Sequence, residues 1–281
     1  MPLATNTTIT MLDGAVLAVH RWIPDAAPDA APRGTIVIAH GLGEHARRYG
    51  QLAHELSNDG WTVWAPDHRG HGRSSGARGT IPTATAIRDD LLEALALARS
   101  AQAGPVVLLG HSMGGAFAAW AIAHAPTAAD ALILSSPALR ADLSIGQRLL
   151  MHTMRRLAPN LTVGNGLDVT GISHDQRVIE AYTADPLVHD RVSPRLAYAI
   201  TIAGETVRTA APDWRTPTLL LYAGADRLVN PQGSADFAAS APRDIVTTRC
   251  FDGLYHELFN EPERDAPVSA VREWLGLRLP R

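Results

Sequence analysis

The chain has 281 residues, of which 25 are basic and 28 acidic, and every basic residue is an arginine. Without lysine, a Schiff base on a lysine amine, a Walker A nucleotide loop and a Ser-Lys dyad are all excluded, and the single Cys250 excludes an intrachain disulfide and a cysteine-rich zinc site. The net charge of −3 predicts no nucleic-acid partner, and no apolar run is long enough for a membrane span.

The N-terminal residues predict a hairpin at the edge of a sheet. Residues 1–6 contain neither a basic nor an apolar segment, so we expect no signal peptide and a cytoplasmic protein. Two short strands at 7–12 and 15–22 flank Asp13-Gly14, a dipeptide typical of tight hairpin turns. The stretch 25–34 is rich in Pro and Ala and predicts a surface loop.

Strand and helix patterns alternate in the rest of the chain, except for a central stretch. Apolar runs of strand length lie at 35–39, 61–65, 106–109, 131–134, 218–223 and 245–251. Helical patterns lie at 49–57, 84–101, 113–124, 234–240 and 267–275. This alternation predicts an α/β fold with a mostly parallel sheet that is covered by helices on both faces.

The central stretch, residues 138–214, contains helical patterns and no convincing strand. We expect it to form a helical cap, or lid, above a core made of residues 1–137 and 215–281. It contains an apolar stripe flanked by three arginines, namely Leu149, Leu150, Met151, Met154 and Leu157 with Arg148, Arg155 and Arg156. Core packing is the simpler interpretation of this stripe. The alternative is a lid surface that meets an acyl chain or makes peripheral contact with a membrane.

The pattern Gly-x-Ser-x-Gly, typical of a serine nucleophile on a sharp strand-to-helix turn, occurs twice. The match GHSMG at 110–114 follows a predicted strand and opens a predicted helix, so Ser112 is the candidate nucleophile. The second match, GRSSG at 72–76, is polar and precedes no helix, so we interpret Ser74 as a loop residue. The helix N-terminus beside Ser112 would offer free N–H groups to an oxyanion.

A serine nucleophile needs a base, and in folds of this type the acid and then the histidine follow the serine in the chain. His256 lies just beyond the last predicted strand, at the same sheet edge as Ser112, and is the candidate base. Asp226 follows the preceding strand at that edge and is the candidate acid. Asp252, which also follows a strand, is the alternative.

The expected oxyanion hole consists of two backbone N–H groups, those of Met113 and Leu42. None of these roles requires a cofactor. The pair His68 and His71 lacks the neighbouring ligands of a metal motif, so we predict no metal site. Cys250, in the last predicted strand, is expected to be a buried core thiol.

Longer stretches around these residues resemble the α/β-hydrolase superfamily, and within it the monoacylglycerol lipases, particularly the bacterial ones. The matching stretches are HGLGEHARRY (40–49), DHRGHGRS (67–74), GHSMGG (110–115), YTADPLV (182–188), DRLV (226–229) and YHE (255–257). The resemblance implies an eight-stranded sheet, a helical cap and hydrolysis of monoacylglycerols.

The resemblance also implies that Glu44, Arg48, His111 and Tyr182 contact the glycerol end of the substrate. The animal enzymes have a second histidine where this chain has Phe259, so we expect the polar end to differ. The alternatives on the same fold are a lysophospholipase or a broad-specificity carboxylesterase, and, less favoured, an aminopeptidase or a non-catalytic binding protein. A homodimer is compatible with the sequence.

Overall fold

The computed structural model describes residues 5–24 and 32–280, so most of the loop predicted at 25–34 lies outside the described residues, as do residues 1–4. Eight strands form one sheet in the order β1-β2-β4-β3-β5-β6-β9-β10. The strands are β1 (Thr5–Thr10), β2 (Val16–Trp22), β3 (Gly34–Ala39), β4 (Trp61–Pro66), β5 (Val106–His111), β6 (Ala131–Ser135), β9 (Thr218–Ala223) and β10 (Val246–Phe251). Strands β1 and β2 are antiparallel to their neighbours and the others run parallel, which confirms the predicted sheet.

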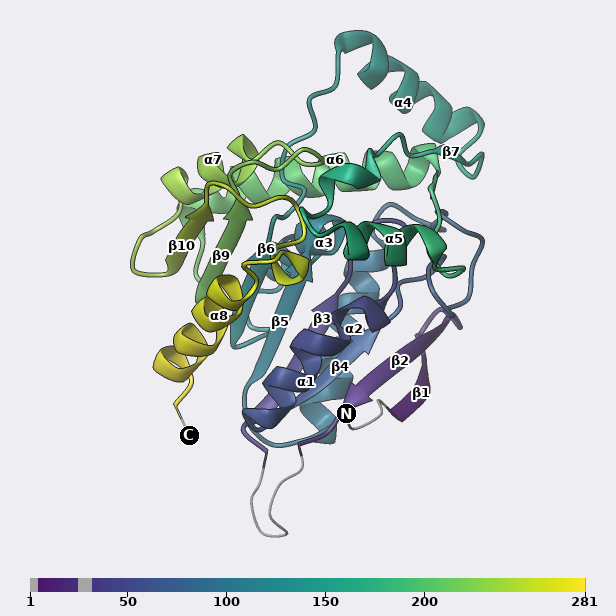
Figure 1. Ribbon diagram of the computed structural model, residues 1–281. Helices are drawn as coiled ribbons and strands as arrows, with labels where there is room; N and C mark the ends of the chain where they lie inside the picture. Colours follow the sequence, from purple (N-terminus) through teal and green to yellow (C-terminus); the bar gives the residue numbers. More distant parts are fainter. Residues whose placement is uncertain (1–4, 25–31, 281) are drawn as a thin grey trace.

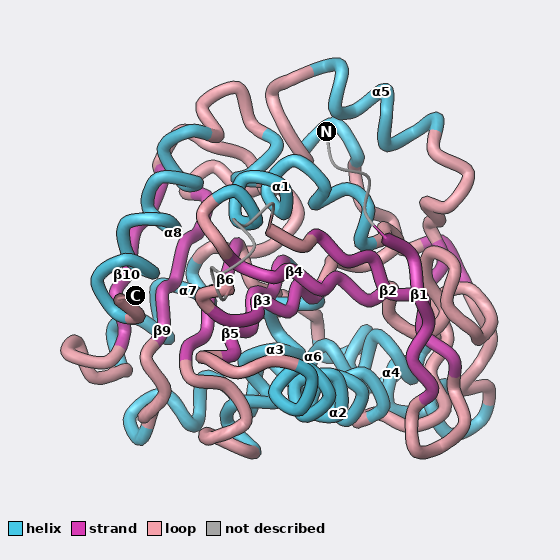
Figure 2. The backbone as a smooth tube through the Cα atoms, turned by 90° about the horizontal axis from the view of Figure 1, so that it is seen from below, coloured by secondary structure: helices cyan, strands magenta, loops and turns pink. Residues whose placement is uncertain are grey.

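Helices cover both faces of this sheet (Figures 1 and 2). Helices α1 (Gly50–Asn58) and α8 (Asp265–Arg278) pack on one face. On the other face lie α2 (Ala86–Ala101), α3 (Ser112–His124), α6 (Pro194–Ala210) and α7 (Gln232–Ser240). Successive residues of β5 alternate between the two cores, with Val106 and Leu108 on one side and Val107 and Leu109 on the other. Burial on both faces explains why the parallel strands are continuous apolar runs.

Residues 138–214 contain α4 (Ile145–Leu157), α5 (Gln176–Ala184) and α6, and also a short antiparallel pair of strands, β7 (Val163–Gly164) and β8 (Arg191–Val192). The prediction that this segment has no strand is wrong in this detail, because a two-residue strand is too short to produce an apolar pattern. Helix α6 begins at a Ser193 cap followed by Pro194, and its apolar face belongs to the main core. The division into a core and a 138–214 cap remains a prediction.

Helix α4 projects from the molecule (Figure 1), and none of its residues is buried. Leu149 is 67% exposed, Leu150 62% and Leu157 77%, so core packing is the wrong interpretation of the apolar stripe. Met151 and Met154 are partly buried, and the hydroxyl of Thr201 in α6 lies 3.8 Å from the sulfur of Met151. Among the described residues, no helix is both long and apolar enough to cross a membrane.

Candidate active site

Ser112 lies at the junction of β5 and α3, where the backbone makes a sharp turn. Its φ is +53°, in the left-handed region that residues other than glycine rarely occupy. The neighbouring Gly114 is required by packing, because a Cβ atom there would lie 2.3 Å from the carbonyl oxygens of Ala39 and His40. The sequence therefore forms the strained turn that presents a serine at the carboxyl edge of a sheet.

His256 and Asp226 lie in contact beside this turn. The Nδ1–H of His256 donates to Oδ2 of Asp226 over 2.7 Å, which leaves Nε2 free to act as a base. The other oxygen of Asp226 accepts from the backbone N–H groups of Leu228 and Val229, both over 2.9 Å. The competing Asp252 instead lies 3.2 Å from the sulfur of Cys250. The geometry therefore places Asp226, and not Asp252, on the histidine.

The environment shifts the pKa of both members of this pair. Burial lowers the pKa of His256, but the Asp226 carboxylate raises it by more, so the pKa lies above its ordinary value. Burial raises the pKa of Asp226, but His256 and the two backbone donors outweigh burial, so the carboxyl is ionised at neutral pH. Asp226 can thus stabilise an imidazolium on His256.

Ser112 and His256 line a single small cavity, with a volume of about 30 Å³. The remaining lining residues are Gly41, Leu42, Glu44, His111, Leu167, Val169, Ile172, Tyr182, Leu228 and Glu257. The loop that contains Leu42 passes directly over the serine, since a Cβ atom on Gly41 would lie 3.3 Å from Cβ of Ser112. Met113 lies in the first turn of α3, where backbone N–H groups have no acceptor within the helix.

A buried charge network includes two of the residues that line this cavity, Glu44 and Glu257. Arg48 donates to Oε2 of Glu44 over 2.7 Å and to both oxygens of Glu257 over 2.6 and 2.7 Å. Its guanidinium also lies over the ring of Tyr182, 4.6 Å from the centroid. Burial raises the pKa of Glu44, but Arg48 overcompensates and lowers it to about 2. Sequence reasoning assigned no role to Glu257, although its position directly after His256 is a signal that could have indicated one.

His111 is buried next to the candidate base His256, with the two ring centroids 4.7 Å apart. Its Nδ1 lies 3.1 Å from the hydroxyl of Ser135. Burial lowers the pKa of His111 to about 4, so this ring is neutral at neutral pH. All four residues that the resemblance assigned to the glycerol end therefore lie at or beside the catalytic cavity.

The second Gly-x-Ser-x-Gly match lies in the loop between β4 and α2, away from this cavity. The hydroxyl of Ser74 donates to the carbonyl of Asp67 over 2.6 Å and accepts from the N–H of Ala18 over 2.9 Å. Ser74 thus fastens the loop to β2. His68 and His71 form hydrogen bonds with backbone carbonyls, and the described part of the chain contains no metal-ligand cluster.

Cys250 is exposed, so the expectation of a buried core thiol is wrong. The physical reason is that β10 is the last strand of the sheet, and one of its faces is open to solvent. Only Val246 of this strand is buried, and a pattern of so few residues does not distinguish an edge strand from a central one.

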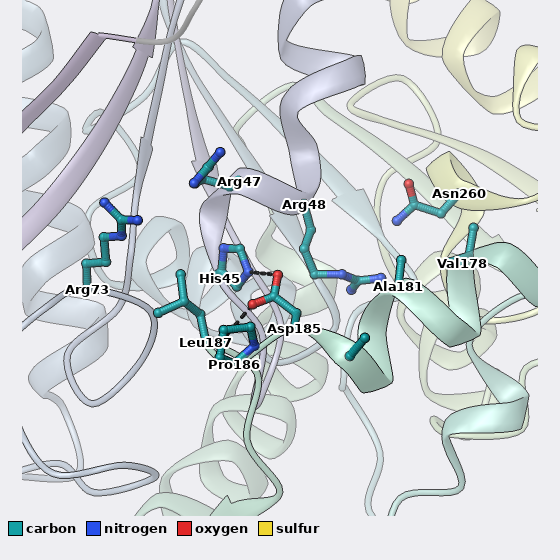
Figure 3. Close-up of a pocket in the computed structure, with 11 residues that line it drawn as sticks. His45, Arg47, Arg48, Arg73, Val178, Ala181, Asp185, Pro186, Leu187 and Asn260 are labelled. Atoms are coloured by element: carbon teal, nitrogen blue, oxygen red, sulfur yellow. Dashed lines mark hydrogen bonds and ion pairs between the residues drawn. The ribbon is translucent and has the colours of Figure 1, made fainter.

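A larger hollow, of about 700 Å³, lies between the 3-10 turn Ala46–Tyr49 and α5. Figure 3 shows Arg47, Arg48 and Arg73 around it, and the hydrogen bond of 2.9 Å between His45 and Asp185. Ser112 and His256 do not line it. The candidate catalytic residues therefore line the smaller cavity, and the size of a cavity does not by itself identify the candidate site.

Comparisons with known proteins show the family to which this chain belongs. A family model described as serine aminopeptidase, S33, matches residues 30–263. A monoacylglycerol lipase of Mycolicibacterium smegmatis is 35% identical over 256 residues, which cover 90% of this chain and 91% of that protein. Phospholipase YtpA of Bacillus subtilis is 33% identical over 246 residues, or 86% of this chain and 94% of that protein.

Among solved structures, the Paleococcus ferrophilus monoacylglycerol lipase superimposes with a TM-score of 0.83 at 31% identity, covering 93% of this chain and 99% of the other. Both the sequence and the structural similarities extend over most of the chain. The chain therefore belongs to the α/β-hydrolase family described as serine aminopeptidase, S33, and is a carboxylic ester hydrolase related to the monoacylglycerol lipases.

Proposed function

We propose that this enzyme hydrolyses monoacylglycerols to glycerol and a free fatty acid through a Ser-His-Asp triad. The observation that carries the proposal is the lining of one cavity, which contains Ser112 and His256 together with both polar and apolar side chains. Relatives named monoacylglycerol lipase support the choice of substrate.

In the proposed mechanism, Nε2 of His256 takes the proton from the hydroxyl of Ser112 as the serine oxygen attacks the ester carbonyl carbon. The N–H groups of Leu42 and Met113 stabilise the oxyanion. His256 then gives the proton to the departing glycerol oxygen, and an acyl-serine remains. Water, deprotonated by His256, attacks the acyl-enzyme and releases the fatty acid.

The polar and apolar residues that line the cavity fit the two ends of the substrate. Glu44, His111, Tyr182 and Glu257 provide polar groups for an alcohol, whereas Leu42, Leu167, Val169, Ile172 and Leu228 provide an apolar wall for the start of an acyl chain. A cavity of about 30 Å³ holds little more than one water molecule. Substrate entry therefore requires the segment with Leu167 and Val169 to move outward, as expected of a lid.

The exposed side of α4 supports a further part of the proposal, peripheral contact with a lipid surface. Arg148 is paired with Glu205 over 2.9 Å, and Arg155 lies over the ring of Tyr198. Of the three arginines in this stripe, only Arg148 has an ion-pair partner among the described residues. The apolar residues, more than the arginines, would then provide the binding energy. A homodimer and a cytoplasmic location remain predictions.

The triad is tested by activity and labelling of two variants. Ser112→Ala should lower the hydrolysis of monooctanoylglycerol by about 10⁴-fold or more and abolish labelling by a fluorophosphonate. Ser74→Ala should retain both in the folded protein. Labelling that survives in Ser112→Ala and disappears in Ser74→Ala would overturn the assignment.

A lysophospholipase is the second candidate, because the similar Bacillus subtilis protein is named a phospholipase. A panel of monooctanoylglycerol, lysophosphatidylcholine and a proline anilide separates a monoacylglycerol lipase from a lysophospholipase and an aminopeptidase. The proposed function predicts the highest kcat/KM for monooctanoylglycerol. Absence of p-nitrophenyl butyrate hydrolysis would instead favour a non-catalytic binding protein.

A further inference from the structure

The charge network beside the catalytic histidine contains two carboxylates and one guanidinium. Glu257 binds Arg48 in a bidentate pair, and Glu44 binds the same guanidinium through Nη1. All three side chains are largely buried, with Glu257 only 6% and Glu44 only 3% exposed. One positive charge therefore balances one of the two negative charges, and the network has a net charge of −1.

Within the described part of the chain, no lining residue of the cavity balances this excess charge with a second guanidinium. Among the described residues that line the catalytic cavity there is no arginine, and His111 is neutral at neutral pH. The remaining hydrogen bonds to the carboxylates come from neutral donors. Glu44 accepts from the N–H of Gly41 over 2.6 Å and from the hydroxyl of Tyr49 over 2.7 Å, and Glu257 accepts from Asn260 over 2.9 Å.

The excess charge lies where the alcohol portion of an ester would be. Glu257 follows His256 directly in the chain, and both line the cavity that contains Ser112. The apolar residues that line the same cavity suit the acyl portion. Since a buried charge is screened little by water or salt, an alcohol bound here would be sensitive to its own charge.

We propose that Glu257 selects the leaving group by charge, so that esters of neutral or cationic alcohols are accepted and esters of phosphorylated alcohols are rejected. The choice of glycerol as the neutral alcohol rests on the proposed function, but the charge rule itself applies to any ester that the enzyme cleaves. Arg48 holds the carboxylate of Glu257 in place. Because the same guanidinium also pairs with Glu44, the network keeps one negative charge in excess, and this excess charge provides the discrimination.

The first test compares two substrates with the same acyl chain, octanoylglycerol and octanoylglycerol phosphate, at concentrations below aggregation. We expect the wild-type kcat/KM to be at least about 100-fold higher for the neutral ester. Glu257→Gln keeps the size of the side chain and removes the charge, so it should reduce this ratio by about tenfold or more. The reduction should persist in about 0.5 M NaCl, because the carboxylate is buried.

The second test uses a pair of esters that differ only in charge, octanoylcholine and 3,3-dimethylbutyl octanoate. The wild type should prefer the cationic choline ester, and Glu257→Gln should lower that preference by about tenfold. Glu263→Gln is the matched control, since it removes an exposed carboxylate from the same region of the chain. It should leave both ratios unchanged.

The outcomes distinguish the charge rule from the proposed function. If the enzyme cleaves octanoylcholine and 3,3-dimethylbutyl octanoate but not octanoylglycerol, the proposed substrate is rejected. The ratio of the two cleaved esters then still tests the role of Glu257. Ratios that stay the same in Glu257→Gln, or a uniform loss of activity on all four esters, would overturn the charge rule. Thermal unfolding and fluorophosphonate labelling of each variant establish that the ratios describe a folded enzyme.

Discussion

The Nδ1 atom of His256 lies 2.7 Å from Oδ2 of Asp226, although 30 positions separate the two residues. They meet because β9 and β10 are adjacent and parallel, so the loops that follow these strands leave the sheet at the same edge. Two backbone N–H groups hold the other oxygen of Asp226. The position of the carboxylate is thus fixed before any substrate binds.

This contact predicts how activity depends on pH. His256 acts as a base only when it is neutral, and Asp226 raises its pKa above the ordinary value of 6.5. Acidification should therefore lower kcat/KM with a midpoint above pH 6.5, since the group whose pKa is raised takes up its proton at a higher pH. A pH profile with p-nitrophenyl butyrate measures the midpoint. A rate that stays flat from about pH 5 to 8 would argue against His256 as the base.

Removing the charge of Asp226 should have two effects. Asp226→Asn should lower kcat by about 10³- to 10⁴-fold, because the histidine loses the group that fixes its tautomer and stabilises its charged form. The midpoint of the residual pH profile should also move down. Asp252→Asn is the matched control, since Asp252 contacts Cys250 and not His256, and it should retain nearly full activity. The reverse result would assign the acid to Asp252.

Gly114 tests the packing that supports the nucleophile. In Gly114→Ala the new Cβ atom would lie 2.3 Å from two backbone oxygens at the end of β3, and neither can move cheaply. We expect a loss of about 2 kcal/mol or more in the free energy of unfolding, and lower kcat because the loop with Leu42 shifts.

Gly276→Ala is the control for Gly114→Ala, because the same substitution is expected to raise stability there and not to lower it. Gly276 lies in α8 with no atom within 4 Å of a new Cβ, so alanine should stabilise the helix by about 0.5–1 kcal/mol. Thermal or urea unfolding compares the two. Equal stability of both variants would contradict the close packing at Gly114.

The exposed leucines of α4 test lipid contact. Leu149→Ser with Leu150→Ser should leave the thermal midpoint unchanged, because both side chains are mostly exposed. The double variant should sediment less with phosphatidylcholine vesicles and lose activity on emulsified monooleoylglycerol, while its activity on soluble esters stays the same. Leu277→Ser, at an exposed position on α8, is the control. Unchanged sedimentation would remove α4 as a lipid-binding surface.

The sequence by itself determined the parallel sheet, the order of its elements and the place of Ser112. These features follow from local rules, because apolar periodicity determines which residues face the core and the Gly-x-Ser-x-Gly turn depends on steric limits within a few residues. The candidate acid and base also followed from strand order, since parallel strands present their carboxyl ends at one edge.

Only the tertiary structure decided the features that depend on residues far apart in the chain. Arg48 and Glu257 are 209 positions apart, and no local pattern indicates that they form a bidentate pair. Likewise, the apolar stripe of α4 has the sequence pattern of a core face. Whether such a face is buried depends on which elements cover it in the fold, and no residue of α4 is buried. Periodicity shows that a face is apolar, but burial and charge balance are properties of the neighbours that the fold brings together.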